Sequence, residues 1–465
     1  MEVTGRKALV LGAGKSGVAS ARFLAARGAT VALHDRKDVE EWSDAAKGLK
    51  TENGVGLIGG DIPSWLLDQI DLVVISPGVP TNTIPARYVD RKDGEVIGEV
   101  ELASRFMKGR IVGITGSNGK TTTTALIGEI LKDAGIPTQV GGNIGTPLLS
   151  LAGTSQDGGV TVAELSSFQL ETIVDMRPSV ALCLNVTPNH LDRYEGFQDY
   201  AAAKHRIFMN QTADDVAVLN ADDEITSGWA KGLKAKVVMF SVRRELDEGV
   251  FLRGSELISR SNGQEVLLTT RDDIFLRGLH NVENVLAAFA AGLACGASIE
   301  SMRETVKNFK GVEHRVEYVT EIDGVRFYND SKATSVDATS KALEALSGGE
   351  GKTILILGGR GKNAPYAPLV PLIESSVRTL VVLGEDGDNI ASQLAGTAEI
   401  IRAESLQDAV SKGLAASQSG DAVLLAPACA SFDMFQSFEE RGTVFKRAVH
   451  ALAEPPALAG GKNAV

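Results

Sequence analysis

The chain of 465 residues is too long for a single compact core and is expected to form about three domains. Its formal net charge of −12 argues against nucleic acid or an anionic membrane surface as the main partner. The three cysteines lie far apart without metal-binding spacing, which predicts buried, reduced thiols in a cytoplasmic protein. We expect neither a signal peptide nor a membrane-spanning segment.

The first predicted domain, residues 1–98, alternates short apolar strands with helices. We expect Gly28 to cap the end of the first helix. Strands are expected at Lys7–Leu11, Thr30–His34 and Asp71–Ile75. Continuous apolar strands that alternate with helices predict a parallel sheet covered by helices on both faces.

The second predicted domain, residues 99–310, restarts this pattern and then changes. Between about Val237 and Leu279, alternating segments around an Asn262-Gly263 turn predict a small antiparallel addition. The strands expected before this addition are Arg110–Ile114, Val160–Leu165 and Val180–Asn185.

The third predicted domain, residues 311–454, begins with a hairpin closed by Asp323-Gly324. Residues 455–465 are predicted to form a disordered tail. The later strands are expected at Thr353–Leu357, Thr379–Leu383 and Asp421–Leu425. The predicted fold is therefore α/β, with a Rossmann-like first domain, a central P-loop-type parallel sheet and a Rossmann-like third domain.

A first glycine loop follows the first strand. Gly12, Gly14 and Gly17 form a GxGxxG pattern, and Asp35 ends the next strand. Small residues in such a loop allow backbone N–H groups and a helix N-terminus to approach a phosphate. The pattern favours a nucleotide such as a UDP-sugar, and it leaves open NAD(P) or a purely structural turn.

A second glycine loop, TGSNGKTT, lies between a predicted strand and a predicted helix. It departs from the GxxxxGK[ST] pattern because its first glycine, Gly116, precedes Gly119 by three positions rather than five. Its backbone N–H groups would hold the β-phosphate of ATP, Lys120 the β and γ oxygens, and the Thr121 hydroxyl a Mg²⁺ ion. The alternative is a glycine turn that only caps the helix.

Three further side chains are candidates for chemistry. Glu164 ends a predicted buried strand, where a Mg²⁺ ligand would lie, although an acid there can also cap the next helix. His190 and Lys204 follow the next strand, and each alone is more often a packed or solvated residue than a catalytic one.

Five strings taken together resemble the Mur ligase family, whose members add amino acids to the UDP-linked peptidoglycan precursor. They occur in the order TGSNGKTT, GGNIG, AELSSFQLE, NVTPNHLDR and YNDSKATS. With LAPACASFDMFQSFEERG, they are most similar to the D-glutamate-adding branch, and the DNPR string expected of the diaminopimelate-adding branch is absent.

The resemblance implies a cytoplasmic enzyme that uses ATP and two Mg²⁺ ions. Its substrates would be UDP-N-acetylmuramoyl-L-alanine and D-glutamate, joined through an acyl phosphate, with ADP and phosphate released. The three domains would bind the UDP moiety, ATP and the incoming amino acid, respectively. We expect a monomer that needs neither nucleic acid nor a membrane.

The resemblance also assigns roles to residues. The catalytic residues would be Lys120, His190, Lys204 and Lys332. The ATP site would comprise Gly116, Ser117, Asn118, Gly119, Lys120, Thr121, Thr122, Asn281, His314, Arg315, Asp330 and Lys332. The Mg²⁺ ligands would be Thr121, Glu164, His190 and a carbamate formed on Lys204. The UDP-substrate would contact Gly14, Lys15, Ser16, Asp35, Arg36, Ser76, Gly78, Asn143 and Ser166. D-Glutamate would contact Thr334, Lys362, Ser431 and Phe438.

One residue departs from the family pattern, and three alternative functions remain open. Arg360 lies where this branch more often has an acid, and the added cation is expected to alter amino-acid affinity or local folding. The alternatives are a ligase of the same architecture with another substrate such as folate, a dehydrogenase suggested by the first loop alone, and a nucleotide sensor without turnover.

Overall fold

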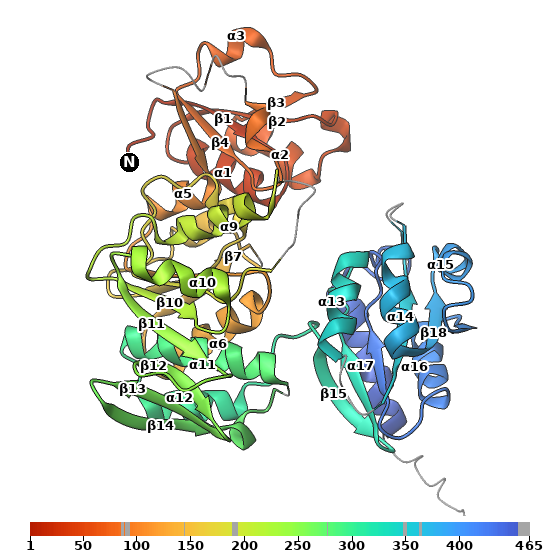
Figure 1. Ribbon diagram of the computed structural model, residues 1–465. Helices are drawn as coiled ribbons and strands as arrows, with labels where there is room; N and C mark the ends of the chain where they lie inside the picture. The colour runs from red at the N-terminus through yellow and green to blue at the C-terminus, as the bar shows by residue number, and fades with distance from the viewer. Residues whose placement is uncertain are drawn as a thin grey trace, which may run out of the picture. The chain divides into compact units, whose positions relative to one another are not determined.

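The computed structural model describes residues 1–84, 88, 94–143, 145–187, 194–276, 278–346, 351–361 and 365–453 (Figure 1). The chain forms two compact units, Met1–Phe309 and Lys310–Val465. The first unit contains two sheets and the second unit contains one. The predicted α/β fold with three sheets is confirmed, while the predicted tail lies outside the described residues.

The N-terminal sheet has five parallel strands in the order β3-β2-β1-β4-β5. The strands are β1 (Lys7–Leu11), β2 (Thr30–Asp35), β3 (Gly56–Gly59), β4 (Leu72–Ile75) and β5 (Glu95–Gly98). The helices are α1 (Lys15–Ala25), α2 (Asp44–Asn53) and α3 (Ser64–Leu67), with short 3-10 turns at Val39–Glu41 and Thr81–Thr83. The chain moves outward from β1 to β3 and returns to β4 on the other side of β1. The carboxyl ends of β1 and β4 therefore flank a topological switch point, where open α/β sheets bind ligands.

The predicted helix cap at Gly28 is confirmed. The regular helix α1 ends at Ala25, and Gly28 has a φ of +82°, where the chain turns toward β2. The N–H of Gly28 bonds back to the carbonyl of Ala25 at 3.0 Å, and the N–H of Ala29 bonds back to the carbonyl of Leu24 at 3.2 Å. This pair of bonds around a left-handed glycine is the usual way in which glycine caps the end of a helix.

The central sheet has nine strands in the order β14-β13-β12-β11-β10-β9-β6-β8-β7. Strands β6 to β12 pair in parallel, and β12, β13 and β14 pair antiparallel. The parallel strands are β6 (Arg110–Thr115), β7 (Thr138–Gly142), β8 (Val160–Glu164), β9 (Val180–Cys183), β10 (Val216–Asn220), β11 (Lys236–Ser241) and β12 (Gly249–Arg253). The predicted antiparallel addition is confirmed as β13 (Glu256–Ser261) and β14 (Gln264–Thr270), joined at Asn262-Gly263, where both residues have positive φ.

Two long helices cover one face of the central sheet. Helix α6 (Lys120–Asp133) and helix α11 (Leu279–Cys295) pack on each other and share a hydrophobic core with the strands. The other helices of this region are α5 (Glu99–Ser104), α7 (Leu148–Leu151), α8 (Ser167–Leu170), α9 (Phe197–His205), α10 (Glu224–Trp229) and α12 (Ile299–Asn308). Short 3-10 turns lie at Arg206–Phe208, Ala230–Gly232 and Arg271–Asp273.

Strand β9 is shorter than predicted. It ends at Cys183 rather than at Asn185. The carbonyl of Asn185 instead accepts the N–H of Ser117 at 2.9 Å, and the side-chain oxygen of Asn185 accepts the N–H of Asn118 at 2.8 Å. Asn185 therefore leaves the sheet ladder because it is bonded to the second glycine loop.

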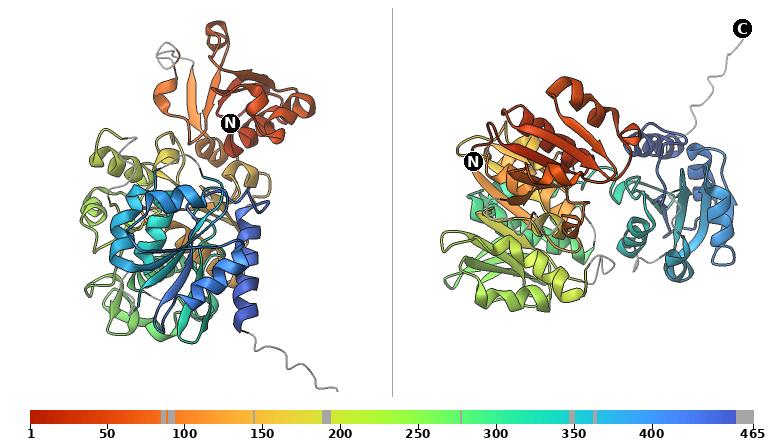
Figure 2. Two further views of the ribbon diagram at one scale, coloured as in Figure 1. Left: turned by 90° about the vertical axis from the view of Figure 1, so that its right-hand side faces the viewer. Right: turned by 90° about the horizontal axis from the view of Figure 1, so that it is seen from above.

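The second unit is a six-stranded sheet in the order β15-β16-β20-β17-β18-β19, covered by helices on both faces (Figure 2). The predicted hairpin is confirmed, with positive φ at Asp323 and Gly324. The strands are β15 (Glu317–Ile322), β16 (Val325–Asn329), β17 (Thr353–Gly358), β18 (Val377–Leu383), β19 (Glu399–Arg402) and β20 (Ala422–Leu425). The helices are α13 (Val336–Leu346), α14 (Val370–Ser376), α15 (Gly387–Gln393), α16 (Leu406–Ala415) and α17 (Phe438–Ala453), with a 3-10 turn at Ala367–Leu369.

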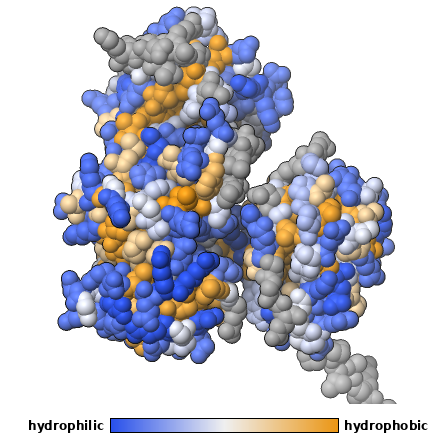
Figure 3. Space-filling model, viewed as in Figure 1, coloured by the Kyte–Doolittle hydropathy of each residue, from blue (hydrophilic) through white to orange (hydrophobic). Residues whose placement is uncertain are grey.

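The next features are the hydropathy of the surface and the state of the three cysteines. The face of the protein in Figure 3 is largely hydrophilic, with scattered hydrophobic residues. Within the described ranges, none of the helices has the length and apolar character needed to cross a bilayer. Cys183, Cys295 and Cys429 are buried and form no disulfide, as predicted.

Candidate active site

The first glycine loop is built for close backbone contact at the switch point of the N-terminal sheet. A Cβ atom at Gly17 would overlap the carbonyl oxygen of Gly12, so only glycine fits this first turn of α1. The Asp35 carboxylate accepts the N–H of Ala13 at 2.9 Å, which ties the end of β2 to the loop. Ser76, at the end of β4, donates from its hydroxyl to the carbonyl of Gly12 at 3.4 Å. The loop is thereby fixed from both sides.

Five more of the residues predicted for the UDP-substrate lie at this same edge of the sheet, whereas Asn143 and Ser166 follow β7 and β8 of the central sheet. Gly14 is the N-cap of α1, and it has no side chain that competes for the free N–H groups of the first turn. Lys15, Arg36 and Gly78 are exposed, and Ser16 is half-buried. Lys15 and Ser16 begin α1, whereas Arg36 and Gly78 follow β2 and β4.

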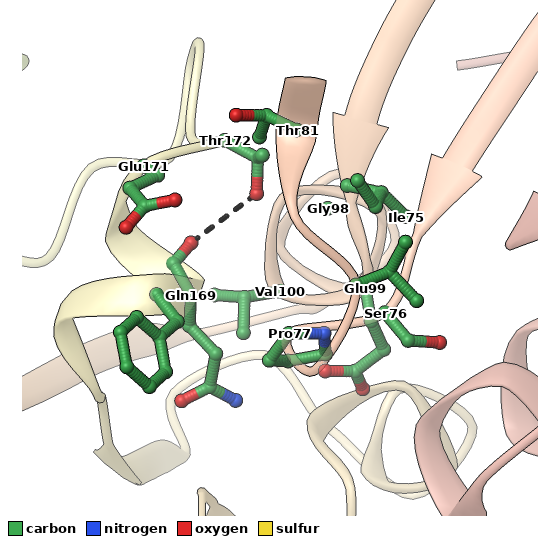
Figure 4. Close-up of a pocket in the computed structure, with 12 residues that line it drawn as sticks. Ile75, Ser76, Pro77, Thr81, Gly98, Glu99, Val100, Gln169, Glu171 and Thr172 are labelled. Carbon is green, nitrogen blue, oxygen red and sulfur yellow. Dashed lines mark hydrogen bonds between the residues drawn. The ribbon is translucent and has the colours of Figure 1, made fainter. Parts of the chain in front are cut away.

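A small pocket lies between the N-terminal sheet and the central region (Figure 4). It is lined by the loop after β4, the start of α5 and the segment of α8. Glu99 contributes a buried carboxyl group to this pocket: its Oε1 accepts the N–H of Leu149 at 2.7 Å, and its Oε2 has no hydrogen-bond partner among the residues that the structure describes. Burial raises the pKa of Glu99 to about 7, because a carboxylate loses hydration there.

Replacing Glu99 with glutamine is expected to remove a pH-dependent loss of stability. The unfolded chain releases this proton near pH 4.5, whereas the folded chain retains it up to a pKa of about 7. Stability therefore falls as pH rises through this range, by about 3 kcal/mol for a shift of this size. Chemical denaturation at pH 5 and at pH 8 should show the E99Q variant gaining on the wild type at the higher pH. A constant difference between the two proteins would contradict the assignment.

The second glycine loop is held in place by hydrogen bonds from β9 and α9. The Ser117 hydroxyl donates to the carbonyl of Thr187 at 3.0 Å and lies 3.1 Å from the Tyr200 hydroxyl. Gly119, the N-cap of α6, has a φ of +82°, and a Cβ atom there would overlap the side-chain oxygen of Asn284. The loop that precedes α6 is thus preorganised, as a phosphate-binding loop needs to be.

Two lysines converge on one carbonyl oxygen of this loop. Lys120 Nζ donates to the carbonyl oxygens of Gly116 at 2.9 Å and Ser117 at 3.0 Å. Lys204 Nζ donates to the same Gly116 oxygen at 2.8 Å, although its side chain is only 1% exposed. Burial and the nearby charge of Lys120 lower the pKa of Lys204 to about 7. The amine of Lys204 is therefore largely neutral at slightly alkaline pH.

The predicted Mg²⁺ ligand Glu164 lies against the same helix start. Its carboxylate accepts the Thr121 hydroxyl at 2.8 Å and the side-chain N–H of Asn143 at 3.1 Å. In the part of the chain that the structure describes, no group of three acidic, cysteine or histidine side chains lies close enough together to bind a metal ion by itself. Mg²⁺ is commonly held by one or two carboxylates plus phosphate and water, so this hydroxyl and carboxylate pair fits the ion.

The other residues predicted for the central region differ in their surroundings. Ser166 caps α8, and its hydroxyl accepts the N–H of Gln169 at 3.3 Å, so it also has a structural role. Asn281 accepts the side-chain N–H of Asn284 at 3.2 Å near the start of α11. Thr122, in the first turn of α6, is half-buried. His190 lies outside the described residues.

Three residues that support the loop were not predicted from the sequence. Asn284 accepts the hydroxyl of Thr123 at 3.2 Å, and Asn185 and Tyr200 bond to the loop itself. The position of Asn284 could have been predicted from the sequence. It lies three residues after Asn281 in the string LHNVEN, which is about one helical turn. Nothing in the sequence alone pairs Tyr200 with Ser117.

The second unit carries its predicted residues on loops at the carboxyl edge of its sheet. Asp330, Lys332 and Thr334 follow β16, and Ser431 follows β20. Phe438 begins α17, and its ring lies 6.0 Å from Lys332 Nζ. Burial raises the pKa of Asp330 to about 7, against the opposing effect of the nearby Arg315.

His314 and Arg360 each interact with nearby side chains of the second unit. The His314 ring lies 6.2 Å from the Phe438 ring, and its Nδ1 is 2.9 Å from the Asn329 amide. Arg360 forms an exposed ion pair with Glu385 at 2.9 Å, so the departure from the family pattern adds no isolated cation. Lys362 lies outside the described residues.

Comparison with known proteins identifies the family. The sequence matches the Mur ligase MurD-like N-terminal domain over residues 6–98, the Mur ligase middle domain over residues 114–292 and the Mur ligase glutamate ligase domain over residues 314–429. The UDP-N-acetylmuramoylalanine–D-glutamate ligase of Koribacter versatilis is 47% identical over 455 residues, which cover 98% of this chain and 99% of that protein. The protein of that name from Pelotomaculum thermopropionicum is 46% identical over 453 residues, covering 97% and 99%.

Solved structures share the fold at lower identity. A pseudomurein peptide ligase type C from Methanothermus fervidus matches with a TM-score of 0.55 and 19% identity, over 96% of this chain and 100% of that chain. The UDP-N-acetylmuramate–alanine ligase of Thermotoga maritima matches with a TM-score of 0.53 and 20% identity, over 96% and 99%. The matched domains follow the three sheets in chain order, and the curated relatives align over nearly the whole length. The chain therefore belongs to the Mur ligase family.

Proposed function

We propose that this protein is a UDP-N-acetylmuramoyl-L-alanine–D-glutamate ligase, which consumes ATP in peptidoglycan precursor synthesis. The observation that carries the proposal is the phosphate loop with Lys120 and Lys204 on one carbonyl oxygen and Thr121 bonded to Glu164. The names of the curated relatives supply the substrates. A dehydrogenase or a non-catalytic sensor would leave this arrangement without a purpose, and neither interpretation is retained.

The three regions divide the substrates between them. Residues 1–98 bind the UDP moiety at the switch point formed by Gly14, Lys15, Ser16, Asp35, Arg36, Ser76 and Gly78. Residues 99–310 bind ATP through the second loop and Asn281, with Asn143 and Ser166 facing the muramoyl group. Residues 311–454 bind D-glutamate through Thr334, Lys362, Ser431 and Phe438, and they complete the ATP site with His314, Arg315, Asp330 and Lys332. The enzyme acts as a monomer in the cytoplasm.

The proposed formation of an acyl phosphate explains why the site needs positively charged groups. A carboxylate does not react with an amine until it is converted to a better electrophile, here an acyl phosphate. Phosphoryl transfer to a carboxylate brings negative groups together, so Lys120 and Lys332 offset that charge. Mg²⁺, held by Thr121 and Glu164, would neutralise phosphate charge and orient the γ-phosphoryl group. The amine of D-glutamate then attacks the acyl carbon, loses a proton and displaces phosphate, and His190 is the proposed orienting group or base.

Lys204 is proposed to act as a carbamate. A neutral Nζ attacks carbon dioxide, forms an N–C bond and releases one proton, which leaves an anionic carboxylate at the end of the side chain. The pKa of about 7 supports this reaction, because it keeps the amine neutral at slightly alkaline pH. The carbamate, Glu164 and His190 would then hold a second Mg²⁺ ion.

The decisive experiment is phosphate release from ATP and Mg²⁺ in the presence of UDP-N-acetylmuramoyl-L-alanine, with single amino acids added in turn. We expect release only with D-glutamate, and the ligated product identified by its mass. Release with another amino acid would retain the ligase mechanism and direct attention to Arg360 and its loop. The absence of release with every amino acid would contradict the proposed substrate.

A further inference from the structure

Arg441 is a buried cation that is hydrogen-bonded to no acidic side chain among the described residues. It lies on α17 and is 2% exposed, and the acceptors of its guanidinium in that part of the chain are neutral oxygens. Burial lowers the pKa of Arg441 to about 10, against the opposing effect of the nearby Asp433 charge, which leaves it charged at neutral pH. A buried charge is expensive to maintain, and an apolar side chain of similar volume often stabilises a fold better. This position therefore calls for an explanation beyond packing.

The acceptors of Arg441 lie at or just beyond the carboxyl ends of three strands. Its Nε donates to the Ser331 hydroxyl at 3.0 Å, and its Nη2 donates to the Ser331 carbonyl at 2.9 Å. Both terminal nitrogens donate to the Cys429 carbonyl, at 3.2 and 3.1 Å, and Nη1 reaches the Gly358 carbonyl at 3.5 Å. Ser331 and Cys429 follow β16 and β20, and Gly358 is the last residue of β17, where the loop after that strand begins. The three strands are adjacent and parallel. One side chain thus joins the starts of three loops at the same edge of the sheet.

Two of these loops carry described residues assigned above to the incoming amino acid. Thr334 lies three residues after Ser331, and Ser431 lies two residues after Cys429. Asp330 and Lys332, assigned to ATP, flank Ser331 on the same loop. The Ser331 hydroxyl also donates to the carbonyl of Phe438 at 2.7 Å, which connects the start of α17 to the same network. The planar guanidinium has five donors in a rigid fork, and that geometry suits the fixing of several carbonyl groups at once.

We propose that Arg441 is a positioning residue for the amino-acid site: it holds the loops after β16, β17 and β20 in one arrangement and places a fixed positive charge beneath a site for an anionic amino acid. The inference rests on the proposed function, because that function assigns D-glutamate to these loops. Arg441 itself touches no substrate in this scheme. Its effect passes through Ser331, Cys429 and Gly358.

The test compares R441M and R441K with R378M as a matched control. Arg378 bonds to Asp421 at 2.8 Å just before β20, at the opposite edge of the same sheet, so its loss weakens this unit without touching the three loops. We expect R441M to raise the KM for D-glutamate by about tenfold or more, because small misplacements of binding groups have large effects. The KM for UDP-N-acetylmuramoyl-L-alanine should stay within about twofold, since none of the residues assigned to that substrate lies on these loops.

R441K separates geometry from charge. A lysine retains the positive charge but has one nitrogen, which cannot reach three loops, so its KM for D-glutamate should also rise. A lysine variant with the wild-type KM would overturn the positioning role. R378M should lower the Tm and leave both KM values unchanged, and an equal rise in the KM for D-glutamate in R378M would show that general destabilisation is the cause.

Hydrogen exchange tests the role of Arg441 without depending on which substrates the enzyme uses. In R441M, backbone amides in all three loops should exchange faster together, and this readout needs no turnover. If the wild type ligates another amino acid, the KM for that amino acid replaces the KM for D-glutamate in the comparison. Unchanged exchange in R441M would overturn the inference even if D-glutamate is confirmed as the substrate.

Discussion

Replacing Lys204 with methionine is expected to lower turnover on the order of a thousandfold, comparable to the loss of a group that stabilises charge in a transition state. The variant cannot form a carbamate, so it loses the anionic oxygen proposed for the second Mg²⁺ ion. Methionine fills most of the buried volume, whereas alanine would leave a cavity beneath the phosphate loop. Steady-state phosphate release with all three substrates measures the loss, and turnover near that of the wild type would discard the carbamate.

The same variant is expected to be more stable than the wild type. Lys204 has an ordinary pKa of 10.5 in the unfolded chain and about 7 in the folded protein. Between these values the unfolded chain binds the extra proton, so the stability of the wild type falls as pH decreases from 10.5 to 7. A shift of this size corresponds to about 4 to 5 kcal/mol, which K204M would recover only in part because the hydrogen bond to Gly116 is lost.

The Tm of both proteins between pH 6 and pH 9, in buffer depleted of carbon dioxide, tests this sign. The advantage of K204M should be largest near pH 6 and should shrink as pH rises. An inactive but stabilised variant would indicate that Lys204 is retained for function at the expense of stability. In ¹³C-bicarbonate, the wild type should also show a carbamate NMR signal that is absent from K204M.

The sheets and the phosphate loops were predictable because their signals are local. Apolar runs such as KALVL and RIVGI each lead directly into a glycine loop, so the position of each loop at the carboxyl end of a strand follows from the pattern. The turns at Asn262-Gly263 and Asp323-Gly324 were predictable for the same reason, since both sequences favour positive φ at two successive positions.

The buried charges were not predictable because their partners are distant in the sequence. The string GEVELA resembles an exposed helix start, yet Glu101 is fully buried and accepts the N–H groups of Val174 and Met176 at 2.8 and 3.0 Å. Arg441, in the string FEERG, likewise resembles a solvated helix position. Only the fold brings three loop carbonyl groups to it, so no local pattern distinguishes it from its neighbours.

Replacing Lys120 with methionine is expected to reduce turnover on the order of a thousandfold and to change the chemistry of Lys204 as well. The first effect follows because Lys120 is the cation proposed for the β and γ oxygens of ATP. The second follows because the charge of Lys120 lowers the pKa of Lys204. Without that charge the pKa of Lys204 should rise, so less of its amine is neutral at a given pH and carbamate formation should shift to higher pH.

The pH at which the ¹³C carbamate signal reaches half its maximum measures this coupling, and it requires no turnover. K132M is the matched control: Lys132 lies on the same helix α6 but is exposed and paired with Glu129 at 2.9 Å. That midpoint should be higher in K120M and unchanged in K132M. An unchanged midpoint in K120M would mean that burial alone lowers the pKa of Lys204. A higher midpoint would show that Lys120 also promotes carbamate formation on Lys204, so that one residue would serve both the phosphates and the proposed metal ligand.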